Sequence, residues 1–226
     1  MERTFVIGDI HGCSKTFKKL LKDVLKVTKE DNIYLLGDYI DRGPDSKKVV
    51  KRIIKMKQNG YKIFPIIGNH ELLLLDSINF IENHHIWFQN GAKYTLKSFG
   101  INYANELKPK YIEFFRNLPY YYIVDKFIIV HGGLNFTIND PFQDKEAMVW
   151  IRDNNVDLKK TGGRRLITGH TPVPLDKIQK SLSKNKILLD GGCVYYNHHA
   201  LLGYLVALEL NSMQLYFQRN IEFNDE

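Results

Sequence analysis

Three apolar segments in the first 70 residues each end in glycine followed by an acid or an amide, and this repeat limits the folds open to the chain. The segments cover 4–7, 33–36 and 62–67, and they end at Gly8-Asp9, Gly37-Asp38 and Gly68-Asn69. A short apolar run that ends in glycine and a polar residue is typical of a buried strand entering a loop. The sequence therefore predicts three buried strands near its start.

Helical spacing separates these strands. Ser14 can cap a helix whose apolar residues recur through Lys26, and Asp45 or Ser46 can cap a second helix that closes near Gly60. Strand, helix, strand, helix, strand is the order of parallel βαβ units with right-handed crossovers. All three strand ends then lie along one edge of a sheet, which is where open α/β sheets build their sites.

The remainder of the chain is predicted to add helices and then more strands. Residues 72–118 are mostly helical and aromatic, and core packing explains most of these rings. Further strands are expected after Pro119, at 121–124, 127–130, 165–168 and 187–189, with a hairpin across 204–218. These strands could form a second sheet that faces the first.

Composition and charge favour one folded domain across residues 1–226. Hydrophobic residues make up 44% and charged residues 25%, which leaves little room for a long disordered region. The formal charge of +7 comes largely from lysines in the two predicted helices. Solvated helix faces therefore explain it better than a nucleic-acid surface, although a positive field also favours anionic substrates.

The two cysteines point to a reducing compartment. Neither Cys13 nor Cys193 belongs to a CxxC pair or a zinc-type spacing, so both thiols are expected to be free. The sequence has no room for a signal peptide before its first motif, and no apolar stretch long enough to span a membrane. We therefore expect a cytoplasmic monomer with no membrane partner.

Five short motifs place oxygen or imidazole ligands beside glycine. The side chains concerned are Asp9, His11, Asp38, Asn69, His131 and His170. Any one of them alone would be read as a turn residue or a hydrogen-bonded histidine. The first three motifs, however, follow successive βα strands, which brings their side chains together. Carboxylate, imidazole and one amide, without thiolate, suit manganese, iron or zinc better than structural zinc or calcium.

The motifs also resemble a known family. GDIHG, GDYIDRGPDS, GNHE and HGG, followed by GHTP, occur in the order found in phosphoprotein phosphatases, within the calcineurin-like metallophosphoesterases. The resemblance extends from Gly8 to about Gly192, and GDYIDRG followed by GNHE is its most specific part. It implies an α/β fold of two facing mixed β-sheets flanked by helices. The short form is similar to bacterial serine/threonine protein phosphatases.

The resemblance implies a centre of two divalent metal ions, with manganese expected and iron or zinc as alternatives. One ion would be held by Asp9, His11 and Asp38. The other would be held by Asp38, Asn69, His131 and His170. Asp38 would then bridge the two ions.

The resemblance assigns the remaining catalytic roles as well. Arg42, Arg152 and Asn69 would bind the phosphate and its developing charge. His70 would be the general acid that protonates the leaving group, oriented and kept charged by Asp41.

The residues and the resemblance together predict hydrolysis of phosphate monoesters by in-line attack of a hydroxide held between the two metal ions. Phosphoserine or phosphothreonine in proteins is the expected substrate, with small phosphate esters also possible. The alternative is a symmetrical dinucleoside polyphosphate hydrolase acting on diadenosine tetraphosphate, because such enzymes resemble this family and share its metal core. The aromatic segment from Trp87 to Phe115 could then stack bases, although core packing explains it equally well.

A non-catalytic binding module of the same fold is the third reading. Such a protein would normally show erosion of the metal ligands or of the acid–base pair. All six ligand positions match, as do Asp41, Arg42 and His70. The sequence therefore favours an enzyme.

Overall fold

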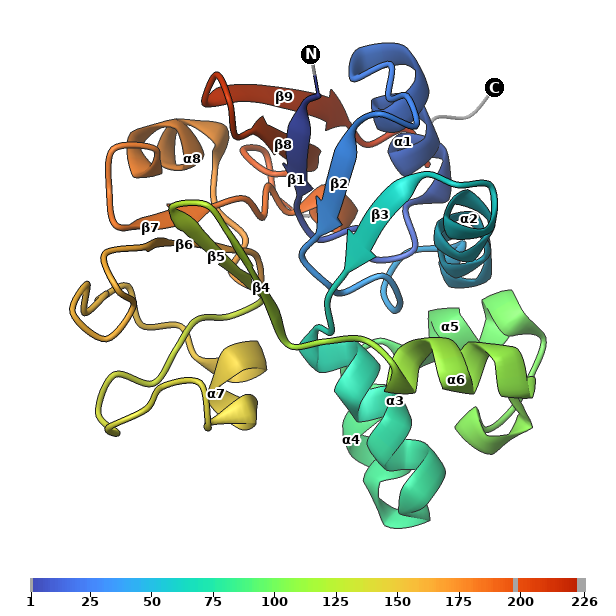
Figure 1. Ribbon diagram of the computed structural model, residues 1–226. Coiled ribbons are helices and arrows are strands. Elements are labelled where there is room, and N and C mark those ends of the chain that lie inside the picture. Colours follow the sequence, from blue (N-terminus) through green and yellow to red (C-terminus); the bar gives the residue numbers. More distant parts are fainter. Residues whose placement is uncertain (1, 197–198, 223–226) are drawn as a thin grey trace.

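The computed structural model describes residues 2–196 and 199–222, and two β-sheets form its centre, with helices around them (Figure 1). The first sheet has five strands in the order β3-β2-β1-β8-β9, and the second has four in the order β4-β5-β6-β7. Both sheets contain parallel and antiparallel pairs. This confirms the predicted α/β fold of two mixed sheets flanked by helices.

The three predicted N-terminal strands are parallel neighbours in the first sheet. They are β1 (Thr4–Ile7), β2 (Asn32–Leu35) and β3 (Lys62–Pro65). Their residues pair without offset, so Ile7, Leu35 and Pro65 end the strands at the same level. The polar residues that follow each strand consequently lie at one edge, as the βαβ pattern predicts.

The helices between these strands are α1 (Ser14–Lys19) and α2 (Ser46–Gln58). The helix predicted from Ser14 to Lys26 divides, because a π-helical turn over Leu20–Val24 follows α1. There the N–H of Leu25 bonds to the carbonyl of Leu20, five residues back. Helix α2 keeps its predicted apolar face, with Val49, Val50 and Ile53 buried.

Alternate side chains of β1 build the two layers of the core. Phe5 and Ile7 belong to the cluster formed with α1 and α2, which lie on the outer face of the first sheet (Figure 1). Val6 points the other way and packs among side chains of β5, β6 and β7. The two sheets therefore face each other, and each fully buried side chain of this size stabilises the fold by about 1.5–3 kcal/mol.

The second sheet confirms most of the later strands. Its members are β4 (Tyr121–Val124), β5 (Phe127–Val130), β6 (Arg165–Thr168) and β7 (Lys186–Leu188). Strands β4 and β5 form the predicted hairpin, and β5, β6 and β7 run parallel. Helix α7 (Lys145–Trp150) covers the outer face, where Met148 packs with Ile128 and Leu166.

The sequence suggested that the final hairpin could belong to the second sheet, but the hairpin belongs to the first. Strands β8 (Tyr204–Glu209) and β9 (Gln214–Arg219) extend the first sheet, because β8 pairs antiparallel with β1. All four residues from Leu205 to Leu208 are buried. A strand that is apolar on both faces suits a central position, and β8 fills one between β1 and β9.

A helical region follows β3. It consists of α3 (Asn69–Asn79), α4 (His84–Gln89), α5 (Ala92–Phe99) and α6 (Pro109–Arg116), with 3₁₀ turns at Ile81–Asn83 and Ala104–Glu106. Trp87, Phe99, Tyr111 and Phe115 are buried here and Phe114 packs against the core, whereas Phe88, Tyr94 and Tyr103 are 49%, 40% and 50% exposed. Most of the aromatic residues thus serve packing, as expected.

The remaining helical elements are α8 (Leu175–Ser181) and a 3₁₀ turn at Cys193–Tyr195. No helix within residues 2–196 and 199–222 is long and apolar enough to cross a membrane.

Both cysteines are free, as predicted, and both are buried. The side-chain amide of Asn220 donates to the carbonyl of Cys193 at 2.7 Å and to Sγ of Cys13 at 3.4 Å. Burial and the neighbouring Cys193 thiol raise the pKa of Cys13 well above its ordinary value. Its thiol is therefore a poor nucleophile.

Candidate metal centre

The loops after five strands bring the six predicted metal ligands together. They follow β1 (Asp9 and His11), β2 (Asp38), β3 (Asn69), β5 (His131) and β6 (His170). All six are buried, with exposed fractions between 0% and 6%. Contacts among these six side chains fix the geometry of the site.

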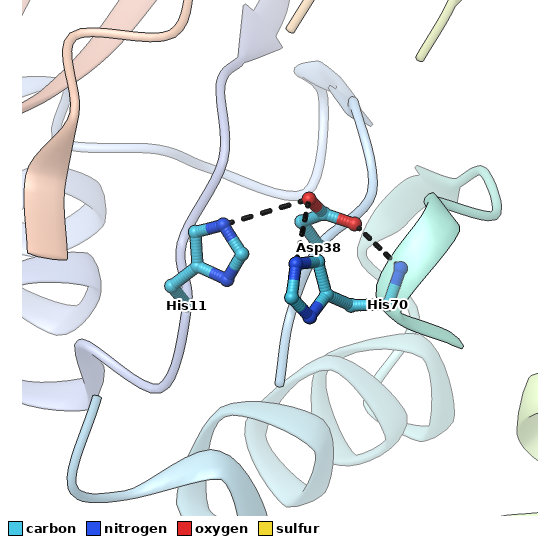
Figure 2. Close-up of side chains that lie close together, drawn as sticks. All are labelled: His11, Asp38 and His70. Carbon is cyan, nitrogen blue, oxygen red and sulfur yellow. Dashed lines mark hydrogen bonds and ion pairs between the residues drawn. The ribbon is translucent and has the colours of Figure 1, made fainter. Parts of the chain in front are cut away.

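Asp38 lies at the centre of the site (Figure 2). Its Oδ2 is 3.5 Å from Nε2 of His11 and 3.4 Å from Nε2 of His131. Its Oδ1 accepts a hydrogen bond from the backbone N–H of His70 at 3.1 Å. One oxygen is thus held by the backbone, while the other faces histidines on both sides and is placed to bridge two cations.

Asn69 and the two later histidines form the second half of the site. Oδ1 of Asn69 lies 2.9 Å from Nε2 of His131 and 2.9 Å from Nδ1 of His170. Within the described residues, Asp38, His131 and His170 make up one group that could hold a metal ion, and His11, Asp38 and His70 make up another. The two groups share Asp38, and one of them contains His70 where the motifs predicted Asp9.

Backbone carbonyls set the orientation of the histidine rings. Nδ1 of His11 faces the carbonyl of Ile40 at 2.9 Å, and Nδ1 of His131 faces that of Leu36 at 2.7 Å. In both residues Nε2 is therefore the nitrogen left for the site. His170 is reversed, because its Nε2 faces the carbonyl of Trp150 at 3.2 Å and its Nδ1 points to Asn69.

Asp9 shows that the site fits a cation. Its Oδ2 accepts from the backbone N–H of His170 at 2.9 Å. Its Oδ1 is buried and has no hydrogen-bond partner among the described residues. A buried carboxylate oxygen without a partner is costly, and a divalent cation would satisfy it. The carboxylate–imidazole–amide set around it fits manganese, iron or zinc.

The ionisable groups of the site strongly shift one another's pKa values. Burial opposes ionisation of Asp38, but His131 and His70 outweigh it and hold the pKa of Asp38 well below its ordinary value. Burial would likewise lower the pKa of His131, but Asp38 and Asp9 raise it to about 10. A proton on His131 competes with a metal ion for the same nitrogen, so metal affinity should fall as pH falls.

His70 and Asp41, which the resemblance predicts to act as an acid–base pair, are in direct contact. Nδ1 of His70 lies 2.7 Å from Oδ2 of Asp41, and both side chains are buried. Asp41 also accepts from Nε1 of Trp87 at 2.8 Å and from Oγ1 of Thr95 at 2.6 Å. Nε2 of His70 has no partner among the described residues and lies 4.0 Å from Oδ2 of Asp38. The ring is therefore fixed with one nitrogen toward the metal centre.

The two predicted phosphate-binding arginines lie at the site, in different settings. Nη1 of Arg42 is 2.8 Å from Nε2 of His11. Burial and this guanidinium lower the pKa of His11 well below its ordinary value, which keeps the imidazole neutral for ligation. Arg152 is exposed, and its Nη1 donates to the carbonyl of His170 and to Oγ1 of Thr171, both at 3.0 Å. It lies at the rim.

Left-handed backbone conformations are concentrated at the site. They occur at His11, Asp38, Asp41, Arg42 and His170, with φ between 43° and 68°. A non-glycine residue in this region costs about 1–3 kcal/mol and persists where the surroundings determine it. The left-handed backbone in these loops therefore directs the side chains into the site, at a cost in conformational strain.

Two glycines allow the backbone to approach the ligands. A Cβ at Gly68 would collide with Oδ1 of Asp38, and one at Gly169 would collide with Oδ1 of Asp9. The glycines noted beside the polar residues in the sequence are thus needed for close packing.

Glu71 is a functional residue that sequence reasoning missed. It is fully buried, and its carboxylate accepts from the backbone N–H groups of Asp38, Tyr39 and Gly68 at 2.8, 2.8 and 3.0 Å. It therefore ties the loop that carries Asp38 to the start of α3. Its position three residues after the helix cap is the signal that could have identified it.

Comparisons with known proteins identify the family of the chain. The family model for calcineurin-like phosphoesterases matches residues 2–213. The asymmetrical bis(5'-nucleosyl)-tetraphosphatase PrpE of Oceanobacillus iheyensis is 26% identical over 219 residues, covering 85% of this chain and 84% of that protein. The symmetrical bis(5'-nucleosyl)-tetraphosphatase of Wigglesworthia glossinidia brevipalpis is 49% identical over 71 residues.

The match to the symmetrical enzyme is local, since it spans 31% of this chain and only 25% of that protein. Among solved structures, a serine/threonine phosphatase from Saccharomyces cerevisiae has a TM-score of 0.66 at 18% identity. The match covers 99% of this chain and 82% of the yeast chain. A cold-active protein-tyrosine phosphatase of a Shewanella species has a TM-score of 0.63 at 13% identity, covering 97% and 81%. These two likenesses show the fold alone, while the family model extends over nearly the whole sequence. The chain therefore belongs to the calcineurin-like phosphoesterase family.

Proposed function

We propose that this protein hydrolyses dinucleoside polyphosphates such as diadenosine tetraphosphate at the centre around Asp38. The geometric observation that carries the chemistry is the convergence of His11, His131 and the shared Asp38 carboxylate within 3.5 Å. Support for the substrate comes from the relatives, because the one aligned along 85% of this chain is named a bis(5'-nucleosyl)-tetraphosphatase. This reverses the preference drawn from the motifs, which put phosphoprotein first.

The chain's own residues divide the work of binding and proton transfer. Two divalent cations held there would make water nucleophilic and neutralise charge on the phosphoryl oxygens. Arg42, beside His11, would bind a phosphoryl oxygen, and Arg152 would contact the substrate from the rim. Nε2 of His70 faces the centre and would donate a proton to the departing oxygen.

Hydrolysis of phosphoserine or phosphothreonine in proteins is the second candidate. The observation that favours it is the buried hydrogen bond between His70 and Asp41, at 2.7 Å. An alkoxide is a poor leaving group without a proton, whereas a nucleoside di- or triphosphate leaves readily as an anion. An oriented acid is therefore of most use with an alkyl phosphate.

Turnover of the two substrates decides between these candidates. The purified protein, supplied with manganese, would be given diadenosine tetraphosphate and, separately, a phosphoserine peptide. We expect faster turnover of the dinucleotide, and its products distinguish symmetrical cleavage to two ADP from asymmetrical cleavage to ATP and AMP. Turnover of the peptide alone would contradict the proposal. An Asp38→Asn variant serves as the control for a contaminating phosphatase.

A further inference from the structure

A cavity adjoins the metal centre on the side of Arg152. It measures about 840 Å³, and its walls come from the segment after α7, the loop after β6, helix α8 and strand β7. Arg152 and Thr171 line it at the end nearest the metal ligands, since Thr171 directly follows His170. The guanidinium of Arg152 donates to the carbonyl of His170 and to Oγ1 of Thr171. Arg152 therefore lines the cavity and also contacts the loop that carries the ligand candidate His170.

The walls of this cavity are rich in positive charge and hydrogen-bond donors. Its cationic side chains are Arg152, Lys177, Lys180, Lys184 and Lys186. Among the described lining residues Asp176 is the one carboxylate, and it is paired with Lys180 at 3.0 Å. No aromatic side chain is among them. Such walls suit a chain of phosphates, and they offer no stacking surface for a base.

Lys186 holds the cavity wall to the metal-binding loop. Its ammonium is buried and donates to the carbonyl of Gly132 at 2.8 Å and to that of Asp153 at 2.7 Å. Gly132 follows His131, and Asp153 follows Arg152. Lys186 therefore ties the loop that carries His131 to the segment that carries Arg152. This link keeps the cavity in place relative to the metal centre.

We propose that this cavity binds the phosphate chain of the nucleotide that leaves when a dinucleoside polyphosphate is cleaved. The volume lies within the usual range of about 300–1,000 Å³ for small-molecule sites. The identity of the reacting substrate rests on the proposed function, whereas the preference for a phosphate chain rests on the walls alone. The ligand class is therefore a nucleoside polyphosphate, recognised through its phosphates.

The test reverses charge at Lys177 and Lys184, which are exposed lining residues outside the catalytic machinery. The double variant Lys177→Glu, Lys184→Glu is compared with Lys19→Glu, Lys29→Glu, which changes net charge equally at exposed positions outside the cavity lining. Each is assayed with excess manganese on p-nitrophenyl phosphate, whose leaving group lacks phosphates. ATP, inorganic tripolyphosphate and adenosine are added as inhibitors, and circular dichroism checks the fold.

We expect the cavity variant alone to weaken inhibition by ATP and tripolyphosphate about tenfold or more, as loss of charge-assisted bonds predicts. Its KM for p-nitrophenyl phosphate should change less than about twofold. Equal inhibition by ATP and tripolyphosphate would assign recognition to the phosphates, and stronger inhibition by ATP would add a contribution from the nucleoside. Unchanged inhibition, the same loss in the control variant, or inhibition by adenosine equal to that by ATP would each overturn the proposal.

This readout is separate from the test of the proposed function. If the wild-type protein does not cleave diadenosine tetraphosphate, the function fails, but inhibition of p-nitrophenyl phosphate turnover still reports on the cavity. If it does cleave the dinucleotide, KM for that substrate should rise about tenfold in the cavity variant and stay unchanged in the control.

Discussion

Asp38 shows how single residues are made to serve this site. Its backbone is left-handed, with φ at 50°, and its N–H donates to the carboxylate of Glu71. Its own carboxylate is divided between the backbone of His70 and the facing histidines. The Gly-Asp motif identified Asp38 as a ligand candidate, but the backbone conformation and the support from Glu71 depend on contacts across more than 30 residues, which no local pattern contains.

Replacing Glu71 with Gln should weaken both the fold and the metal centre. The carboxylate accepts three backbone hydrogen bonds, and an amide would turn its NH₂ group toward at least one of these donors. An unsatisfied buried donor of this kind costs about 1–3 kcal/mol. We expect a lower Tm and reduced manganese content by elemental analysis.

Glu106→Gln provides the matched control for that change. Glu106 accepts from the backbone N–H groups of Asn102 and Tyr103, but at the exposed surface. Its replacement should alter Tm little and metal content not at all. Equal effects of the two substitutions would contradict the role assigned to Glu71.

His70→Asn should slow hydrolysis of alkyl phosphates while metal remains bound. His70 is held by Asp41 through Nδ1, and loss of a positioned general acid typically costs about 10²–10⁴ in rate. The loss should be smaller for diadenosine tetraphosphate, because its leaving group is a stable anion and gains less from the proton that His70 supplies. Rates on both substrates and metal content would be measured together. An unchanged rate with a phosphoserine peptide would remove His70 from the mechanism.

The secondary-structure elements were easier to predict than their partners. The strands at 121–124, 127–130 and 165–168 have the predicted bounds, because each is an apolar run with clear turn signals. The place of β8 was not predictable in this way. Its buried run from Leu205 to Leu208 fits a central strand of either sheet, and only pairing with the distant β1 settles the choice.

The ends of neighbouring strands are held by ion pairs as well as by the sheet. Arg3, before β1, donates to both oxygens of Asp31 at 2.9 and 2.7 Å, and Thr28 donates its N–H to the same carboxylate. Burial opposes ionisation of Asp31, but these bonds outweigh it and keep its pKa below the ordinary 3.8. A lowered pKa means that the pair stabilises the fold above about pH 4, and that this contribution is lost as pH falls further.

Asp31→Asn should therefore lower stability at neutral pH by roughly 1 kcal/mol, since Arg3 is partly exposed and solvent screens the pair. The difference in Tm between wild type and variant should shrink as pH falls from about 6 to about 3. Asp176→Asn, which breaks an exposed pair with Lys180, is the control and should change Tm little at any pH. A Tm difference between wild type and Asp31→Asn that stays constant with pH would contradict the charge interaction assigned to Asp31 and Arg3.

At the scale of the whole molecule, the metal centre lies between the two sheets. Asp9, Asp38 and Asn69 follow strands of the first sheet, whereas His131 and His170 follow strands of the second. Ions bound by both groups would cross-link the sheets at one edge. Sequence motifs predicted the members of this set, and the resemblance to a known family supplied their assignment.

Removal of metal should consequently destabilise the entire fold. Anything that binds only the folded state stabilises it by RT ln(1 + [L]/Kd), which is about 2.7 kcal/mol at a hundredfold excess over Kd. EDTA should lower Tm by several degrees, and added manganese should restore it. The shift should grow smaller in an Asn69→Ala variant, which removes a ligand shared with His131 and His170. A Tm that is indifferent to EDTA would contradict a cross-linking role.

The position of β8 also matters while the chain is being synthesised. Strand β1 emerges from the ribosome before either of its neighbours in the sheet, and one of these two begins only at Tyr204. Until that segment has been made, the open side of β1 exposes backbone groups that can pair with other chains. Completion of the first sheet must therefore wait until β8 has been made, and the growing polypeptide is most exposed to aggregation just before that point.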